Sequence, residues 1–515
     1  MSDTLSRRDF LFYGGATALG ITLGELGRRQ LARVDARAAA WRDRGLETWA
    51  TSVCRECPAA CGVRVRLMDG VPVKLEGNPL CPIARGRLCA KGQAGIEAYF
   101  DPDRLIGPAR RVGKRGEGRW EPITWADAMD LLASHVRQAQ GHPGGSIVAL
   151  AAEEQGPLAD AWARFWKAGG AQVAWTPGAT AARLEPGLRA ITGAKAHPLF
   201  DVEHATHVLS FGASMVEDWL SPVWSQRSFG RFRRGPSRQR GRLVQVDVRR
   251  SLTARKADEW LALPDGQQVA LAYGLAAVLL RENRVHRAFL DEFGGNLAAF
   301  EREAVARYSP DNVAALTGIP VVTVLRLARE LAASSQPLVV VAAEANPKLV
   351  EAVFALNALV GAFDRPGGIL ACPATPVPEA ESAVTALHDI AAGSLRPRLL
   401  ALRDASALRS LSAPLDPSAG LGSATLVVSF SPFLDETASI ADLLLPTHTA
   451  LEAWHLLAPA PAAPAEAIAV TKPAVRPRLD TRDASAILKA TADTVGGPLA
   501  EACPWKSSED LVGAE

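Results

Sequence analysis

The chain has 515 residues, of which 48% are hydrophobic and 22% are charged, a composition typical of a globular protein with more than one domain. Its 57 basic and 55 acidic residues leave a formal net charge of +2, so the composition gives no reason to expect a nucleic acid partner. Seven cysteines are too few, and odd in number, for a disulfide-stapled secreted fold.

Residues 1–46 differ in character from the rest of the chain. A polar start that contains Arg7 and Arg8 is followed by a weakly apolar, glycine-interrupted stretch from Phe10 to Leu26, which is a poor membrane span. The letters "SRRDFL" resemble a twin-arginine export signal. They predict export of the folded chain to the periplasmic side of the inner membrane, with the signal either cleaved or retained as an anchor.

Three cysteines lie within eight positions, and a fourth follows much later: Cys54, Cys57, Cys61 and Cys89, with the spacing C-x2-C-x3-C-x27-C. One short turn and one distant loop can supply the four thiolates of a cubane [4Fe-4S] cluster. A structural zinc site is the alternative, although zinc usually takes two short cysteine pairs. Cys81 lies between the third and fourth positions and is interpreted as a small apolar loop residue; the alternative is that it takes the place of Cys89 as a ligand.

The segment that separates Cys61 from Cys89 predicts a β-hairpin. Apolar residues alternate on both sides of an Asp69-Gly70 pair, which is a strong signal for a two-residue hairpin turn. The fourth cysteine would then arrive from a loop beyond this hairpin.

The run "CRECPAACGVRVRLMDGVPVKLEGNPLCPIARGRLCAKGQAG" resembles the N-terminal iron–sulfur domain of the molybdopterin oxidoreductase family. The resemblance implies that Lys91, in "CAKG", lies between the cluster and a pterin and helps electrons pass between them. The later "ITWADA" is similar to a helix start in this family, with Thr124 as the cap and Asp127 as its acidic partner.

Beyond the cluster region, short apolar strands alternate with helices. Buried strands are expected at 146–153, 171–175, 205–214, 241–250, 337–346 and 423–433, and helices at 157–170 and 267–283. This alternation predicts an α/β fold with doubly wound parallel sheets, in which ligands lie beyond the carboxyl ends of the strands.

The resemblance also implies a division into domains. The expected parts are a signal and linker at 1–46, a small β-rich [4Fe-4S] domain at 47–112, an α/β domain at 113–190 and 366–500, a Rossmann-like α/β domain at 191–365, and a tail at 501–515. Members of the family carry a final barrel-like domain, and the end of this chain shows no strand-rich pattern for it.

Three positions in the family pattern would contact pterin nucleotides: Gly212, Asp247 and Gln268. The turn that usually reads G-x-N-P is "GASM" here. Gln268 stands where the family usually has an Asp, whose carboxylate pairs with two N–H donors of guanine. A Gln amide cannot copy this pairing, so the sequence argues against two bound pterin nucleotides.

The usual protein ligand of molybdenum is also missing from its expected place. Relatives supply Cys, selenocysteine, Ser or Asp before the first nucleotide strand, although some members bind the metal without a side chain. Between 147 and 209 this chain has no Ser and no Cys, and its only Asp residues are Asp160 and Asp201. The sequence therefore predicts a pterin-type fold without molybdenum.

The pattern is most similar to the molybdopterin-like subunits of alternative complex III and menaquinone reductase complexes. It implies an iron–sulfur electron-transfer subunit of a membrane quinone oxidoreductase. The partners would be a multi-cluster ferredoxin-like subunit and a polytopic quinone-binding membrane subunit, with a multihaem cytochrome c as a candidate donor. Two alternatives stay open: a catalytic bis-molybdopterin guanine dinucleotide subunit completed by a partner chain, and a structural or assembly body without a redox centre.

Overall fold

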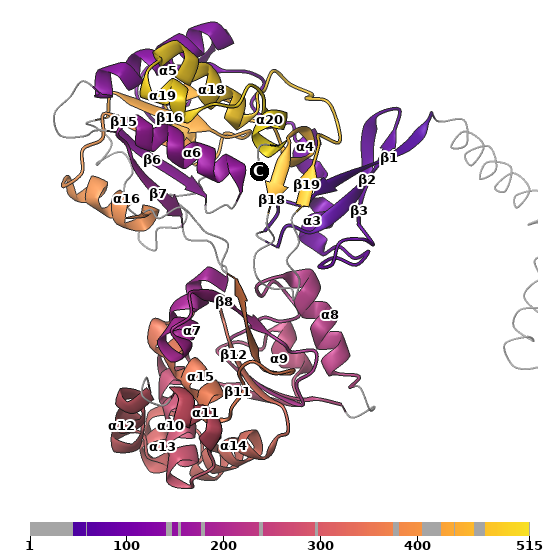
Figure 1. The fold of residues 1–515 in the computed structure, drawn as a ribbon, viewed down its shortest axis with the longest axis vertical. Helices are drawn as coiled ribbons and strands as arrows, with labels where there is room; N and C mark the ends of the chain where they lie inside the picture. Colours follow the sequence, from indigo (N-terminus) through magenta and orange to yellow (C-terminus); the bar gives the residue numbers. More distant parts are fainter. Residues whose placement is uncertain are drawn as a thin grey trace, which may run out of the picture.

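The computed structural model describes residues 45–57, 59–140, 147–152, 156–176, 181–235, 240–293, 297–373, 381–403, 424–436, 438–457 and 469–513. The expected export signal at its N-terminus falls outside these residues. Figure 1 shows two α/β lobes, one above the other, with a small β domain beside the upper and larger lobe.

The small domain is a three-stranded antiparallel sheet of β1 (Glu47–Val53), β2 (Gly62–Met68) and β3 (Val71–Gly77). Asp69 and Gly70 join the last two strands, with φ angles of 51° and 81°. Both angles are positive, as a type I′ turn requires. The predicted hairpin is therefore present.

The two strands of this hairpin differ in the side chains that they bury. Val63 and Val65 of β2 are fully buried, whereas Val71 and Val73 of β3 are 48% and 46% exposed. The strand register shifts after Arg66. Because neighbouring strand residues face opposite sides, this irregularity turns the two valines of β3 toward solvent.

The remaining elements around this domain are short. They are α3 (Ala90–Ala94), α4 (Glu97–Phe100) and a hairpin of β18 (His455–Leu457) and β19 (Ala469–Thr471). The β19 strand lies against β1, so the late part of the chain returns to the small domain, as Figure 1 shows.

The larger lobe is built on an eight-stranded sheet. Six strands are parallel, and two antiparallel strands extend one edge. In order across the sheet they are β14 (Glu381–Ser382), β7 (Gln172–Thr176), β6 (Ile147–Ala152), β15 (Leu399–Arg403), β16 (Leu426–Phe430), β17 (Leu443–Leu444), β4 (Ala109–Arg111) and β5 (Trp120–Pro122). The small-domain boundary expected at 112 lies beyond β4, which pairs in this sheet.

Helices cover both faces of the larger sheet. Ile147 and Ala149 of β6 pack in one core with α5, α6, α18 and α19, whereas Val148 and Leu150 pack in a second core with α16. Such alternation places consecutive side chains on opposite faces. The helices of this lobe are α5 (Trp125–Gln140), α6 (Pro157–Ala168), α16 (Ala383–Ala392), α18 (Ala484–Val495), α19 (Pro498–Ala502) and α20 (Ser508–Gly513), with 3-10 turns η3 (Ala438–Ile440) and η4 (Ala450–Glu452).

The predicted start of α5 is confirmed at its cap. The Thr124 hydroxyl oxygen accepts the Asp127 backbone N–H at 3.1 Å, and the same hydroxyl donates to the Asp127 carboxylate at 2.7 Å. This reciprocal pair satisfies a backbone donor that the first turn leaves open.

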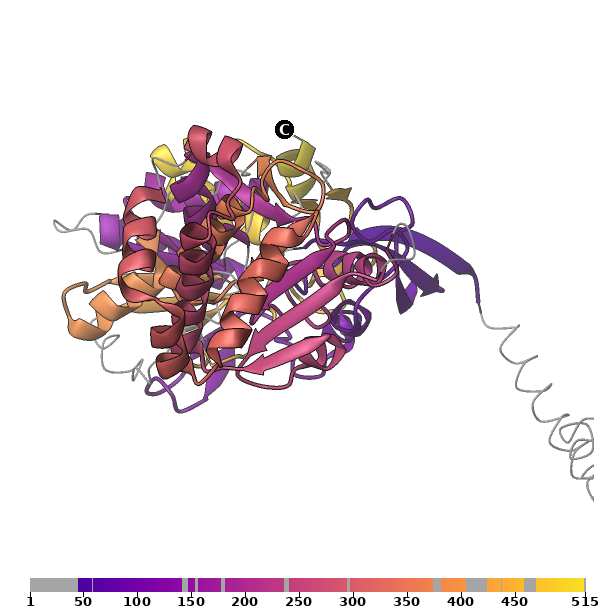
Figure 2. The same cartoon turned by 90° about the horizontal axis from the view of Figure 1, so that it is seen from below.

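The smaller lobe has a four-stranded parallel sheet. Its strand order is β11 (Glu259–Ala262), β10 (Arg242–Asp247), β9 (His207–Phe211) and β12 (Pro337–Val341). Its helices are α7 (Glu185–Thr192), α8 (Pro222–Phe232), α9 (Leu252–Lys256), α10 (Asp265–Arg281), α11 (Arg287–Phe293), α12 (Ala298–Arg307), α13 (Pro310–Thr317), α14 (Val321–Ala333) and α15 (Pro347–Leu359), with η1 (Ala181–Leu184) before them. Figure 2 shows the helices of this lobe gathered beside the strands.

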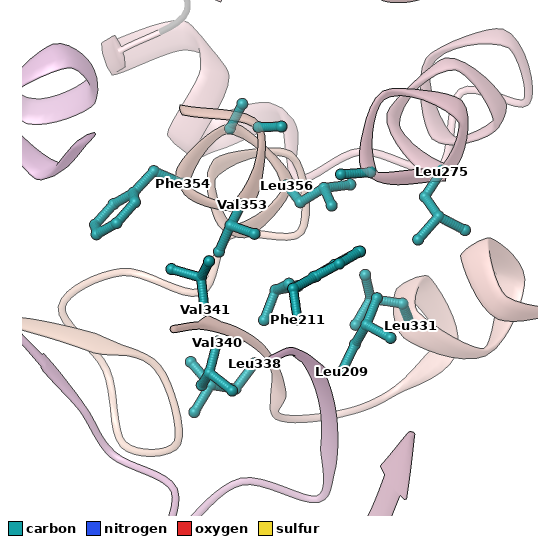
Figure 3. Packing of buried hydrophobic residues seen from close by; sticks show 14 of the residues in the cluster. Leu209, Phe211, Leu275, Leu331, Leu338, Val340, Val341, Val353, Phe354 and Leu356 are labelled. Carbon is teal, nitrogen blue, oxygen red and sulfur yellow. The ribbon is translucent and has the colours of Figure 1, made fainter. Parts of the chain in front are cut away.

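The core of the smaller lobe is formed between its sheet and its helices. Figure 3 shows Phe211 of β9 and Val341 of β12 facing Leu275 of α10 and Leu356 of α15. All four side chains are fully buried. Their burial stabilises the lobe by about 2 kcal/mol for each side chain.

Two antiparallel strands, β8 (Ala196–Phe200) and β13 (Ile369–Pro373), join the lobes. The whole smaller sheet lies between them in sequence. Beyond β8, the Asp201 carboxylate accepts the Gly367 N–H at 3.0 Å, and Gly367 has a φ of 78°, which favours glycine. This contact fixes the "RPGG" turn that leads into β13.

The α/β class with doubly wound parallel sheets is confirmed, and each of the six predicted strands is present. One central strand, β15, was not predicted from its short run "LLALR". The expected tail at 501–515 is not separate, because Cys503, Trp505 and Leu511 are buried in the core of the larger lobe. Among the described residues, no single helix is long and apolar enough to span a membrane. The bent pair α13–α14 reaches the required length and apolar composition only when its two helices are counted together.

His207, at the start of β9, should make the stability of the fold depend on pH. Burial, followed by the positive charge of Arg242, lowers the pKa of His207 to about 4. The unfolded chain binds this proton near pH 6.5. The contribution of the neutral His207 to stability is therefore fully present above that pH and is lost as the pH falls toward 4. We expect this group to lower the unfolding free energy by about 2 kcal/mol between pH 7 and pH 5. Urea unfolding of a His207→Gln variant should lose this part of the pH dependence; an equal fall in both proteins would contradict the assignment.

Candidate functional site

Three of the four predicted cluster cysteines lie in one tight turn after β1. The Cys54 N–H donates to the Cys61 carbonyl at 2.8 Å, and the Ala60 N–H donates to the Cys57 carbonyl at 3.3 Å. Ala60 has a φ of 46°, so the chain doubles back within this turn. Cys89 lies at the N-cap of α3, on the other side of the hairpin.

The structure brings these distant cysteines into one apolar core. Cys54 and Cys61 are buried with Val63 and Val65, while Cys57, Cys81 and Cys89 pack against the same core. Gly92 of α3 approaches the turn closely: a Cβ there would lie 3.3 Å from the Cys54 Sγ. The first turn of α3 therefore lies directly against the cysteine turn.

Burial of these thiols opposes their ionisation. Burial raises the pKa of Cys54 to about 12 and raises the pKa values of Cys57 and Cys61 as well. Cys89 adds to the raised pKa of each of the three, whereas Cys81 adds only to that of Cys61. Such a pocket holds thiolates only when a metal centre supplies positive charge, because metal binding deprotonates a thiol.

Cys81 has partners other than the turn cysteines. Its Sγ accepts the Gly62 N–H at 3.3 Å and the Ala84 N–H at 3.4 Å. These two contacts tie its loop to the start of β2. Its interpretation as a structural loop residue stays a prediction.

Lys91 lies in α3 with an exposed side chain. Its positive charge acts on the Cys57 thiol and on the Glu56 carboxylate, lowering both pKa values against the larger raising effect of burial. Lys91 is therefore near the cysteine turn. Its role in electron passage stays a prediction.

No group of three or more His, Cys, Asp or Glu side chains among the described residues is arranged to hold a single metal ion. That geometry concerns one ion with all ligands around it. A cubane binds its thiolates at four separate irons.

The three predicted nucleotide positions lie at the carboxyl ends of the smaller sheet or just beyond it. Gly212 follows β9 with a φ of 70°, and its N–H donates to the Val246 carbonyl at 2.9 Å. Asp247 ends β10, and its carboxylate accepts the Ser251 hydroxyl at 2.8 Å and the Gln245 amide at 3.3 Å.

Gln268 is also bonded within the chain. It is buried near the start of α10, where its amide donates to the Asp265 carboxylate at 3.0 Å and to the Leu263 carbonyl at 3.3 Å. Met215, in the turn after β9, is 1% exposed and packs in the core of the smaller lobe. The polar groups of the Asp247 and Gln268 side chains are therefore already hydrogen-bonded to neighbouring groups of the chain.

The two Asp residues between 147 and 209 have structural positions. Asp160 lies inside α6. Asp201 accepts the Gly367 N–H and also contacts His204 at 2.7 Å. Neither offers a free carboxylate at the end of a central strand.

Sequence reasoning missed a buried ion pair beside the small domain. Arg104 and Glu452 meet at 2.7 Å, with side chains 1% and 0% exposed. Burial raises the pKa of Glu452. Hydrogen bonds from Arg104, the Arg478 N–H and Thr449 together lower the pKa by more than burial raises it, so the pKa is below its usual value. The partners lie 348 positions apart, and no local pattern could have found them.

The cysteine-rich turn and the two lobes built on parallel sheets define an α/β protein with a cysteine-rich N-terminal domain. The chain matches the family model "Molybdopterin oxidoreductase" over residues 104–494 and "Molybdopterin oxidoreductase Fe4S4 domain" over residues 47–99. The chain belongs to the molybdopterin oxidoreductase family.

Several curated relatives have similar sequences. The chain is 28% identical over 535 residues to the menaquinone reductase, molybdopterin-binding-like subunit of Nitratidesulfovibrio vulgaris, covering 99% of this chain and 74% of the relative. It is 26% identical to the thiosulfate reductase molybdopterin-containing subunit PhsA of Salmonella typhimurium, covering 71% of this chain and 47% of the relative. It is 28% identical to the periplasmic nitrate reductase of Desulfovibrio desulfuricans, covering 70% and 48%. The chain thus spans about half the length of the last two.

Among solved structures, acetylene hydratase from Pelobacter acetylenicus has a similar fold. The TM-score is 0.73 at 20% sequence identity, and the match covers 90% of this chain and 71% of that structure. At this identity the match concerns the fold alone.

The family implies two bound groups, and the described residues fit them differently. Five cysteines meet in one apolar core, and the four with the predicted spacing, Cys54, Cys57, Cys61 and Cys89, fit an iron–sulfur cluster. At the nucleotide edge, Asp247 and Gln268 are bonded within the chain and Met215 lies in the core. A pterin dinucleotide would have to compete with these contacts for Asp247 and Gln268, and Met215 offers it no polar group.

Proposed function

We propose that the chain is the iron–sulfur electron-transfer subunit of a membrane-associated quinone oxidoreductase complex, with the molybdopterin oxidoreductase fold but without molybdenum. The observation that carries the proposal is the convergence of Cys54, Cys57, Cys61 and Cys89 on one apolar core. The chain would accept and donate single electrons through a [4Fe-4S] cluster, with Lys91 beside it.

The nucleotide edge supports the absence of molybdenum. Asp247 and Gln268 are used within the chain, and between 147 and 209 there is no Ser or Cys, while Asp160 and Asp201 have structural positions. The similarity to a menaquinone reductase subunit supports the quinone complex. We propose that the twin-arginine route exports the chain to the periplasmic side of the inner membrane. Its partners there would be a multi-cluster ferredoxin-like subunit and a polytopic quinone-binding subunit.

Metal analysis with anaerobic EPR tests this proposal. We expect about four iron atoms per chain, no stoichiometric molybdenum, and a cluster signal on reduction. Stoichiometric molybdenum with extractable pterin guanine dinucleotide would instead support a catalytic subunit completed by a partner chain. A colourless chain without iron would leave a structural or assembly body.

A further inference from the structure

Three arginines gather where the small domain meets α8. Arg85 and Arg87 lie in the loop that ends at Cys89, and Arg227 lies on α8. The first turn of α8 packs directly on the small domain, because Trp224 shares a core with Cys54. The Arg227 guanidinium lies over the Trp224 ring, 5.2 Å from its centre.

The charges of these arginines are not balanced by carboxylates. Burial, followed by the nearby charges of Arg85 and Arg87, lowers the pKa of Arg227. In the part of the chain that the structure describes, none of the three forms an ion pair, whereas Arg233 and Arg242 of the smaller lobe are paired with Asp258 and Glu259 at 2.6 and 2.9 Å. Like charges held close together in this way favour an anionic partner.

An exposed apolar side chain accompanies the arginines. Leu80 is 90% exposed, and its loop is held in shape by Asn78, which accepts the Leu80 N–H at 3.0 Å through its side chain and the Gly86 N–H at 3.1 Å through its carbonyl. We call the surface of Leu80, Arg85, Arg87 and Arg227 the arginine face. Arginine beside an exposed apolar residue is typical of protein interfaces.

We infer that the arginine face is the docking surface for an acidic redox protein that exchanges electrons with the cluster, an inference that rests on the proposed electron-transfer function. The loop that carries this face ends at Cys89, so a protein bound there lies beside the fourth thiolate. The segment 1–44 does not complement the face, because it has eight arginines and five acidic residues. The required partner has a carboxylate-rich surface around its own redox centre.

The test uses the full chain with its cluster reduced by dithionite, and the excess reductant removed. The probe is plastocyanin, an acidic copper protein: one electron passes from the reduced cluster to Cu(II), giving Cu(I) and loss of the blue colour. The variant is Arg85→Glu with Arg87→Glu, and stopped-flow measurement gives the second-order rate. We expect a fall of about tenfold at low ionic strength, and a smaller difference at high salt.

The matched control is Arg255→Glu with Lys256→Glu, which makes the same charge change on exposed residues of α9. Its rate should stay within about twofold of the unchanged chain. Leu80→Ser, which leaves all charges in place, should also slow plastocyanin reduction. Basic cytochrome c should not be slowed by the Arg85 and Arg87 reversals.

The outcomes separate the two proposals. If the unchanged chain reduces plastocyanin but the reversals at Arg85 and Arg87 slow it no more than the α9 control does, the docking inference is wrong and electron transfer stands. A chain that takes up no reducible cluster overturns both. Iron content and absorbance at about 400 nm identify variants that have kept their cluster.

Discussion

Cys89→Ser removes the iron–sulfur cluster: this is the expected result with the largest effect. The serine hydroxyl replaces a thiolate at one corner of the cubane, and the other three thiols lie in a core where burial raises their pKa values. We expect the iron content to fall from about four atoms per chain to well below one, with loss of the brown absorbance at about 400 nm. Iron analysis after anaerobic reconstitution measures the change.

Cys81→Ser is the matched control, because Cys81 lies in the same loop and contacts the same core. Its Sγ accepts two backbone N–H groups, and a serine oxygen can accept similar bonds. We expect iron content and colour to be unchanged. The opposite pattern, with iron lost in the Cys81 variant and kept in the Cys89 variant, would reassign the fourth ligand.

Arg104→Met is expected to destabilise the junction between the small domain and the larger lobe. The substitution leaves the Glu452 carboxylate buried without its guanidinium partner. An unpaired buried charge costs about 3–5 kcal/mol. We expect a clear fall in the midpoint of thermal unfolding, measured by circular dichroism.

Two further variants show whether the lost charge pair is the cause. Adding Glu452→Gln to Arg104→Met removes the stranded charge, and the Gln oxygen can still accept the Arg478 N–H that Glu452 now binds at 2.9 Å. This double variant should regain part of the lost stability. Arg110→Met breaks an exposed pair with Glu121, whose side chains are each 54% exposed, and should cost at most about 1 kcal/mol. Equal losses in Arg104→Met and Arg110→Met would contradict the argument.

The sequence predicted those parts of the fold that depend on nearby residues. The Asp69-Gly70 turn and the Thr124 cap each depend on contacts within a few positions, and both are present. The register shift after Arg66 and the central strand β15 were not predicted. A bulge depends on how two strands meet, and a five-residue apolar run could equally belong to a helix.

The candidate site was predictable to a similar degree. Cysteine spacing indicated which thiols would converge, and the family pattern indicated Asp247 and Gln268 as positions of interest. The sequence could not indicate that both side chains bond within the chain. It also could not pair Arg104 with Glu452, because the two residues lie 348 positions apart and no local pattern links them.

The two strands that join the lobes have a consequence for engineering. β8 and β13 pair along their length, from Ala196 with Pro373 to Phe200 with Ile369. The chain therefore passes into the smaller sheet and returns from it at one place. A unit whose ends are held together can be excised and its gap closed by a short turn. The excised unit must begin before η1 and α7 rather than at β8, because Leu188 packs in the core of the smaller lobe. Its removal also takes away Trp224, which packs in the core that holds Cys54, so the cysteine turn keeps its native surroundings only when the smaller lobe is present.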